Sequence, residues 1–174
     1  FAMLRAGARG DMARQLDEVF GFPAGDRPEG SPHEALNALT ADLVSPSTLA
    51  GGRAAPTVEI ANGVFLADWF GPQVQQAFVD TLAAQYGARP ETVDFGSKAA
   101  LERVNGWVKE KTHGRIPKVF ASLDPATVLV LANAVYLKAS WLKQFEPERT
   151  STGPFTTSAG TKVDARMMRQ MTTD

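Results

Sequence analysis

The pattern of apolar and polar positions predicts two long strands in this chain. From Pro56 to Ala67, the apolar residues Val58, Ile60, Val64 and Leu66 alternate with polar or small residues, a period that is typical of a strand with one buried face. The segment VLVLANAVYLK, Val128 to Lys138, is apolar at nearly every position and is expected to be one buried strand from end to end. Each strand carries one asparagine, Asn62 or Asn133, on its more apolar face. Because an amide buried without partners costs about 1 to 3 kcal/mol, we expect Asn133 to be hydrogen-bonded.

Spacings of three and four residues between apolar positions predict four helices. The clearest start is SPHE, in which Ser31 is a good N-cap, Pro32 takes the first helical position and Glu34 completes a capping box. The expected helices are one capped by Asp11 and stopped by Gly21 and Pro23, one from Pro32 to Leu43, one from Pro72 to Gly87, and one capped by Ser97 that ends at Lys111.

Each expected helix has a stripe of apolar side chains along one side. The order of the expected helices and strands indicates the fold class. Helices come first, then a mixture, then two short strands that start at Pro154 and Thr161 and flank a turn at Ser158 to Gly160. This order predicts an α+β fold rather than a regular βαβ wind. The stripes are Leu16, Val19 and Phe20, then Leu36, Leu39 and Leu43, then Val74, Phe78 and Leu82, and last Ala100, Leu101, Val104, Trp107 and Val108. The glycine-rich stretch from Ser47 to Pro56 is expected to be an exposed loop.

Charge and composition exclude several classes of function. The 18 basic and 19 acidic side chains give a net charge of -1, without a basic run, so nucleic-acid and membrane-surface binding are not expected. Cysteine is absent, which excludes disulfides and thiolate chemistry. No stretch is long enough for a membrane span, and FAMLRAGARG is too short for a signal peptide. Phe1 to Leu4 is expected to be the tail of a helix whose beginning is missing.

The common catalytic motifs are also missing. His33 and Glu34 begin an H-E-x-x-H pattern, but Asn37 breaks it, so His33 is expected to be a solvated residue in the first helical turn. There is no nucleophile elbow, phosphate-binding loop or dinucleotide fingerprint. His113 stands at a helix end, where its partial charge is favourable for structural reasons. We therefore expect no enzyme activity, no cofactor and no metal site.

Three stretches in a fixed order resemble the serpin family of protease inhibitors. They are VEIANGVFLAD from Val58, VDFGSKAALERVNGWVKEKTHGRI from Val93, and LANAVYLKASWLKQFEPERT from Leu131. The last is similar to the serpin pattern N-x-x-[YF]-[FL]-K-G-x-W-x-x-x-F-x-x-x-x-T, with Ala139 in place of glycine. Arg166 stands where the family usually has proline. The resemblance covers residues 1–174 and implies a partial serpin domain, from the end of helix B to strands of sheet C.

The resemblance implies a fold in which helices pack on a large mixed sheet A, with the start of sheet C. In this family a protease cuts an exposed reactive-centre loop, which then inserts as a new strand into sheet A. That loop lies near the C-terminus of serpins, past Asp174, so we expect this chain to be a fragment without it. The target is then a serine or cysteine protease, bound through a loop outside this chain, and the remaining C-terminal part of the fold is a second partner.

The resemblance also assigns residues to the moving parts of that sheet. Asn133 and Asn62 match the shutter at the centre of the sheet, where Asn133 is expected to bond serines and a histidine outside this chain. Lys138 and Trp141 match the breach, where the loop first enters. An alternative for Asn133 is that it only satisfies a neighbouring backbone group, and for Trp141 that it fills a core. Asn105 and Trp107 match the helix that lies across the sheet.

A second function is compatible with the same resemblance. A non-inhibitory serpin would carry a ligand or act as a chaperone, and the sequence of the reactive loop would separate the two. The helix from Pro32 to Leu43 matches the heparin-binding helix of some serpins but has no lysine or arginine, so heparin is not an expected partner. Family resemblance makes a secreted or extracellular location the expectation, and enrichment in alanine, glycine and arginine hints at a bacterial source.

Overall fold

A computed structural model describes residues 1–22, 31–44, 56–141 and 143–170. The chain divides into two units, Phe1–Lys138 and Ala139–Asp174, which we describe one at a time. The expected loop at Ser47 to Pro56 lies, except for its last residue, outside the described part.

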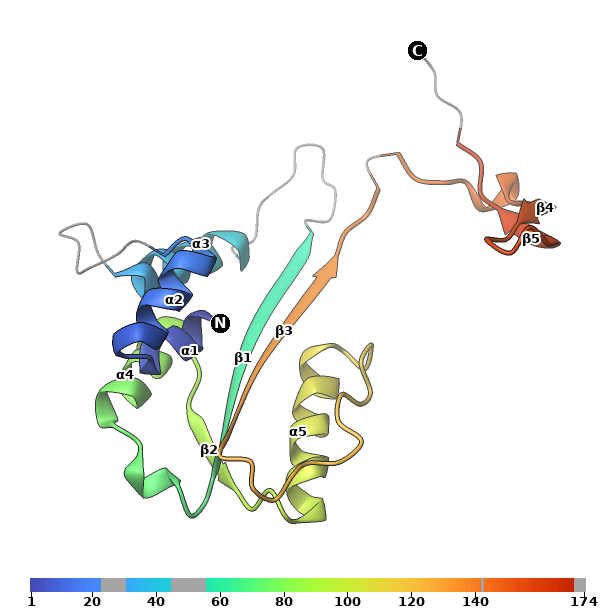
Figure 1. Ribbon diagram of the computed structural model, residues 1–174. Coiled ribbons are helices and arrows are strands. Elements are labelled where there is room, and N and C mark those ends of the chain that lie inside the picture. Colours follow the sequence, from blue (N-terminus) through green and yellow to red (C-terminus); the bar gives the residue numbers. More distant parts are fainter. Residues whose placement is uncertain (23–30, 45–55, 142, 171–174) are drawn as a thin grey trace. The chain divides into compact units, whose positions relative to one another are not determined.

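The first unit is built around a three-stranded mixed sheet with the order β2-β1-β3 (Figure 1). β1 (Thr57–Ala67) pairs antiparallel with β3 (Leu129–Lys138) along its length, so that Thr57 faces Lys138 and Leu66 faces Leu129. β2 (Pro90–Val93) pairs parallel with β1, but only from Val64 onward. Both long strands are confirmed to within a residue or two of their expected ends, and β3 lies at one edge of the described sheet.

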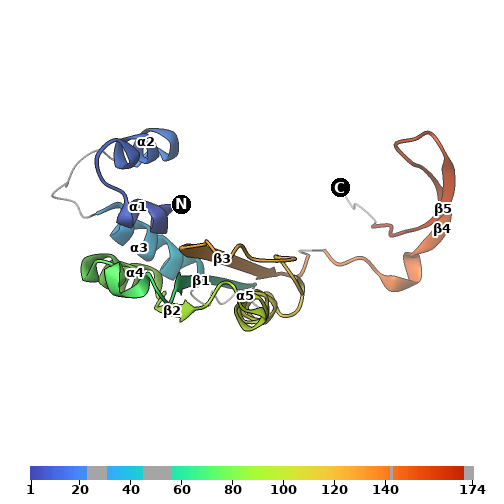
Figure 2. The same ribbon diagram turned by 60° about the horizontal axis from the view of Figure 1, so that its bottom comes forward.

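Helices cover both faces of this sheet. α5 (Lys98–Lys111) lies along β1 and β3, apart from the other helices (Figures 1 and 2). The helices on the other side are α1 (Ala2–Gly7), α2 (Gly10–Phe20), α3 (Pro32–Val44) and α4 (Gln76–Tyr86), with a short 3-10 turn at Gly71–Gln73 before α4.

Strand alternation divides the core into two clusters, one on each face of the sheet. Phe65 and Ala67 of β1 pack with Ala134 of β3 against α5, in a cluster that also contains Phe95, Val104, Trp107 and Val108. The intervening β1 residues Val64 and Leu66 face the other way, in a cluster with Met3, Ala6, Leu82 and Ala88. The central strand is therefore buried on both faces.

The second unit contains a β-hairpin. β4 (Ser151–Thr156) pairs antiparallel with β5 (Lys162–Met167), and a 3-10 turn (Pro147–Arg149) precedes it. Gly160 in the connecting turn has φ 80°, a left-handed conformation that favours glycine. Both short strands and the turn between them were expected from the sequence.

Capping residues in the sequence correctly predicted where several helices begin or end. Ser31 and Glu34 form the expected capping box: the Ser31 N–H donates to Glu34 Oε2 at 3.0 Å, and the Glu34 N–H donates to Ser31 Oγ at 3.3 Å. Ser97 Oγ accepts from the Ala100 N–H at 3.1 Å and caps α5 as predicted. Gly21 and Gly87 end α2 and α4 in left-handed conformations, as expected.

Two other start predictions were wrong. The N-cap of α2 is Arg9, so Asp11 lies inside the first turn, where its charge favours the helix dipole instead of capping it. Pro72 belongs to the 3-10 turn, and α4 starts later, at Gln76.

The expected inward stripes of α2 and α3 are not buried. Val19 is 75% exposed in α2, and Leu39 and Leu43 of α3 are 54% and 50% exposed. Neither helix contains a buried residue. Leu16 and Leu36 are half-buried, so the described residues cover these stripes only in part.

Candidate functional site at the centre of the sheet

Two asparagines meet at the middle of the β1–β3 pair. Asn62 and Asn133 occupy directly opposite positions in the register. The Asn133 Nδ2 group donates to Asn62 Oδ1 at 2.9 Å, and the Asn62 Nδ2 group donates to the Tyr86 carbonyl oxygen at 3.1 Å. A chain of hydrogen bonds therefore runs from β3 through β1 to the last residue of α4.

The burial predicted for Asn133 was wrong. The Asn133 side chain is exposed, whereas the next residue, Ala134, is 6% exposed and packs on the α5 side. On the face of Asn133, Leu129 and Leu131 pack against the second cluster, but Val135 and Leu137 are 60% and 66% exposed. That face of β3 is covered by α1 and α4 only near its start, so the apolar pattern did not translate into burial.

Asn133 has hydrogen-bond partners within the chain, and its expected partners outside the chain remain a prediction. Besides Asn62, its amide approaches the Ala61 carbonyl oxygen at 3.4 Å. The structure thus brings together the two residues expected at the shutter, and the side-chain amide of Asn133 donates a hydrogen bond to that of Asn62. Their role in opening the sheet remains a prediction.

Tyr86 links this amide chain to α3, a connection that the sequence did not reveal. The Tyr86 hydroxyl lies 2.6 Å from His33 Nδ1, and burial raises the pKa of Tyr86 to about 12. Burial also lowers the pKa of His33, and the nearby Arg5 lowers it further. His33 is therefore a partly buried contact between α3 and α4, and not the solvated residue that we expected. The two residues are 53 positions apart, so no local signal could have found the contact.

Trp107 of α5 packs directly on β1. Its side chain is 8% exposed and meets the Phe65 ring edge to face, with centroids 6.2 Å apart. A Cβ atom added to Gly63 would lie 3.0 Å from two indole carbons, Cε2 and Cζ2. Only glycine lets the indole approach the strand this closely.

Asn105, the other residue expected on this helix, holds the segment that follows it. Its Oδ1 accepts from the Val119 N–H at 2.8 Å and from the Phe120 N–H at 3.0 Å, and its Nδ2 donates to the Phe120 carbonyl at 3.0 Å. In α5, Trp107 therefore contacts the sheet, and Asn105 fixes the chain that returns to β3.

The far end of α5 is joined to the sheet by His113. Its Nε2 lies 2.9 Å from Glu59 Oε2 of β1, and its ring centroid is 4.2 Å from that of Tyr136 in β3. These two contacts were not predicted, and the favourable charge expected for His113 at the helix end remains a prediction.

The two residues expected at the breach belong to different units of the chain. Lys138 is the exposed last residue of β3 in the first unit. Trp141 belongs to the second unit, where it contacts the Phe145 ring edge to face and is 71% exposed. Trp141 does not fill a core of that unit, and the breach assignment remains a prediction.

Within the described ranges, no group of three or more His, Asp or Glu residues could hold a metal ion. No helix there is long and apolar enough to cross a membrane.

Comparison with known proteins identifies the class of this fold. The family model described as "Serpin (serine protease inhibitor)" matches residues 1–173, and the chain belongs to the serpin family. It is 32% identical to Iripin-8 of Ixodes ricinus over 98% of this chain, and 32% identical to the leukocyte elastase inhibitor of Xenopus tropicalis, also over 98%. The match covers 41% and 43% of those proteins, so the chain spans about two-fifths of their length.

Solved structures agree with this assignment. The native stressed conformation of Arabidopsis AtSerpin1 matches with a TM-score of 0.78 and 27% identity, over 97% of this chain and 42% of that one. Cleaved kallistatin complexed with heparin matches with a TM-score of 0.82 and 26% identity, over 96% and 47%. The expected α+β, serpin-like fold is confirmed. The relatives named here are eukaryotic, and nothing in the comparisons supports the expected bacterial source.

The contact between Trp107 and Gly63 makes a first prediction. Gly63→Ala in the complete natural protein should lower the free energy of unfolding by about 1 to 3 kcal/mol, because the indole or β1 must shift. Denaturant unfolding measures the change. Gly106→Ala is the matched control: its new Cβ meets no atom within 4 Å, and in a helix interior the substitution should stabilise by up to about 1 kcal/mol. A Gly63→Ala variant as stable as the parent would contradict this packing.

Proposed function

We propose that this chain is part of a serpin-type protease inhibitor that acts by cleavage of a reactive loop and its insertion beside β3. The observation that carries the proposal is the Asn62–Asn133 hydrogen bond, placed at the centre of the strand that forms one edge of the described sheet. The family match and the similarity to an elastase inhibitor support it.

The outer edge of β3 is suited to accept another strand. The Ala67 N–H donates to the Val128 carbonyl, so the antiparallel ladder directs the backbone groups of Leu129, Leu131 and Val135 away from β1. No strand of the described part pairs with this edge. Exposed edges of this kind template the addition of a further strand. The proposed insertion needs such an edge, and β3 has it along its whole length.

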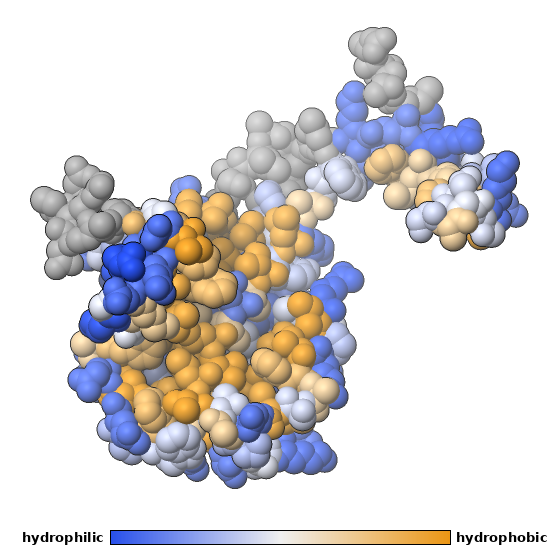
Figure 3. Space-filling model, viewed as in Figure 1, coloured by the Kyte–Doolittle hydropathy of each residue, from blue (hydrophilic) through white to orange (hydrophobic). Residues whose placement is uncertain are grey.

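The same region of the surface is strongly apolar. Figure 3 shows hydrophobic side chains gathered over the middle of the first unit, around β1 and β3. The exposed residues Val135 and Leu137 belong to this strand pair. We propose that the remaining part of a serpin fold covers this surface, which is consistent with the two-fifths of the relatives' length that the chain spans.

The amide pair is suited to act as a latch because it is strong enough to hold and weak enough to break. One net hydrogen bond contributes about 0.5 to 1.5 kcal/mol, so a rearrangement that offers Asn133 new partners can release Asn62 at low cost. Apolar packing alone offers no such exchange, since it has no directional partner.

A non-inhibitory serpin that carries a ligand or acts as a chaperone is the second candidate. It is favoured by structural matches to lamprey angiotensinogen and emu ovalbumin, whose names do not describe inhibitors. We propose that both candidates share the fold described here and differ in the sequence of the reactive loop.

Partners and location follow from the proposed class. The target is a serine or cysteine protease, and the protein is secreted or extracellular. Heparin is not a proposed ligand: it is present in the kallistatin structure, but α3 of this chain has neither lysine nor arginine.

The direct test is a covalent complex with a protease. The complete natural protein should form a complex with at least one serine or cysteine protease that survives a denaturing gel, and residues 1–174 alone should form none. Cleavage of the complete protein as an ordinary substrate by every protease in a broad panel would favour the second candidate. A stable complex with residues 1–174 would contradict the proposed mechanism, because it needs a loop outside this chain.

The latch makes a separate prediction. In the complete protein, Asn133→Ala should lower the stability of the native form by about 1 kcal/mol and speed its conversion on mild heating to a latent form or polymers. The loop-cleaved form should keep its melting temperature. Native gels follow the conversion, and Asn37→Ala, which removes an exposed asparagine of α3, is the matched control. Equal loss in both forms with an unchanged conversion rate would make Asn133 a purely structural residue.

A further inference from the structure

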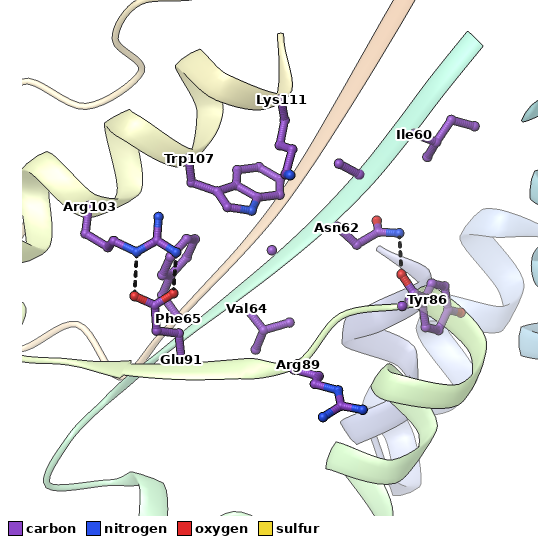
Figure 4. A pocket seen from close by; sticks show the side chains of 13 residues that line it. Ile60, Asn62, Val64, Phe65, Tyr86, Arg89, Glu91, Arg103, Trp107 and Lys111 are labelled. Carbon is purple, nitrogen blue, oxygen red and sulfur yellow. Dashed lines mark hydrogen bonds and ion pairs between the residues drawn. The ribbon is translucent and has the colours of Figure 1, made fainter. Parts of the chain in front are cut away.

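A pocket of about 440 Å³ lies on the side of β1 away from β3, where β2 leaves the sheet. Its walls are the backbone of β1 from Ile60 to Phe65, the chain from Tyr86 to Glu91, and one side of α5 (Figure 4). This volume is within the range of small-molecule sites. The proposed inhibitory mechanism uses the opposite edge of the sheet, so it gives this pocket no function.

Positive charge predominates among the side chains that line the pocket. Arg89, Arg103 and Lys111 contribute cations, and Glu91 is the one carboxylate of the lining. Both oxygens of Glu91 are already bound, to Arg103 Nε at 2.6 Å and Nη2 at 2.7 Å. Two cations therefore remain without a carboxylate among the lining residues.

The remaining cations differ in position. Lys111 Nζ lies 2.8 Å from Glu110, a residue outside the lining, and keeps further N–H donors. Arg89 makes no hydrogen bond or ion pair with the described residues, and in Figure 4 its guanidinium is directed away from Trp107. Arg89 thus adds charge to the lining farther from the indole, while Lys111 and Arg103 lie closer to it.

A donor that is open to the pocket lies at the same place. The Trp107 side chain is 8% exposed, and its indole N–H has no hydrogen-bond partner among the described residues. Figure 4 shows this indole between Arg103 and Lys111, with its nitrogen on the side that faces the pocket. The indole N–H is a donor only, and at this position it can donate to an acceptor held in the pocket.

We propose that this pocket binds a small, polar anion with several phosphate or carboxylate groups. Lys111 and the free N–H of Arg103 supply charge-assisted hydrogen bonds, and the indole N–H of Trp107 supplies a neutral one. Arg89 adds a further positive charge to the lining. Because none of these residues belongs to β3, the proposal holds whether or not the protein inhibits a protease.

The test uses the complete natural protein, titrated with pyrophosphate and with citrate at constant ionic strength, since exposed charges are screened by salt. Calorimetry should show binding of at least one of the two anions. Lys111→Gln should weaken that binding about tenfold, the effect of losing one charge-assisted hydrogen bond. Lys109→Gln is the matched control, because it removes the same charge from the same end of α5 at an exposed residue outside the pocket. Tighter binding of pyrophosphate would identify a phosphate ligand, and tighter binding of citrate a carboxylate ligand.

A second measurement locates the anion. With ¹⁵N-labelled tryptophan, the indole signal of Trp107 should move on titration, while those of Trp69 and Trp141 serve as internal references. Trp107→Phe assigns the signal. An unmoved Trp107 signal, or equal weakening by Lys111→Gln and Lys109→Gln, would overturn the proposal, because binding would then depend on net charge and not on this pocket.

Discussion

The pairing of β1 with β3 is the constraint on which the rest of the first unit depends. β1 is covered by α5 on one face and by α1 and α4 on the other, so both sets of alternating side chains must be apolar where the helices pack. Asn62 and Asn133 interrupt that pattern at directly opposite positions in the two strands. Asn133 donates a hydrogen bond to Asn62, and Asn62 donates one to the Tyr86 carbonyl at the end of α4. A polar link is thus placed where a purely apolar strand pair would have only packing.

The two edges of the sheet have different surroundings. Beyond β3, the described residues offer an open ladder edge and exposed apolar side chains such as Val135 and Leu137. On the other side, β2 covers only the end of β1, and the uncovered part lies beside Arg103 and Lys111 of α5 and Arg89, which precedes β2. The first edge is suited to accept a strand, and the second a small charged molecule. One strand, β1, lies between the two proposed sites, with Asn62 facing both Asn133 and the pocket.

Local signals predicted much of the fold, because short-range chemistry determines helix ends and strand periods. Ser31 with Glu34, Ser97 and Gly87 acted as the sequence indicated. The side-chain environment was predicted less well, since burial depends on segments far away in the chain. Asn62 and Asn133 were assigned to the same kind of site by family resemblance, but their direct contact joins residues 71 positions apart. The same holds for His33 and Tyr86, whose hydrogen bond no period or motif could indicate.

The most direct test of the amide link is a double-mutant cycle in the complete natural protein, with Asn62→Ala, Asn133→Ala and the double variant. The free energy of unfolding of each native form is measured, and the cycle cancels the bond that Asn62 alone makes to Tyr86. If the two amides are coupled as described, the double variant should lose less than the sum of the single losses, by about 1 kcal/mol. Additive losses, within about 0.3 to 0.5 kcal/mol, would show that the two side chains do not hold β1 and β3 together.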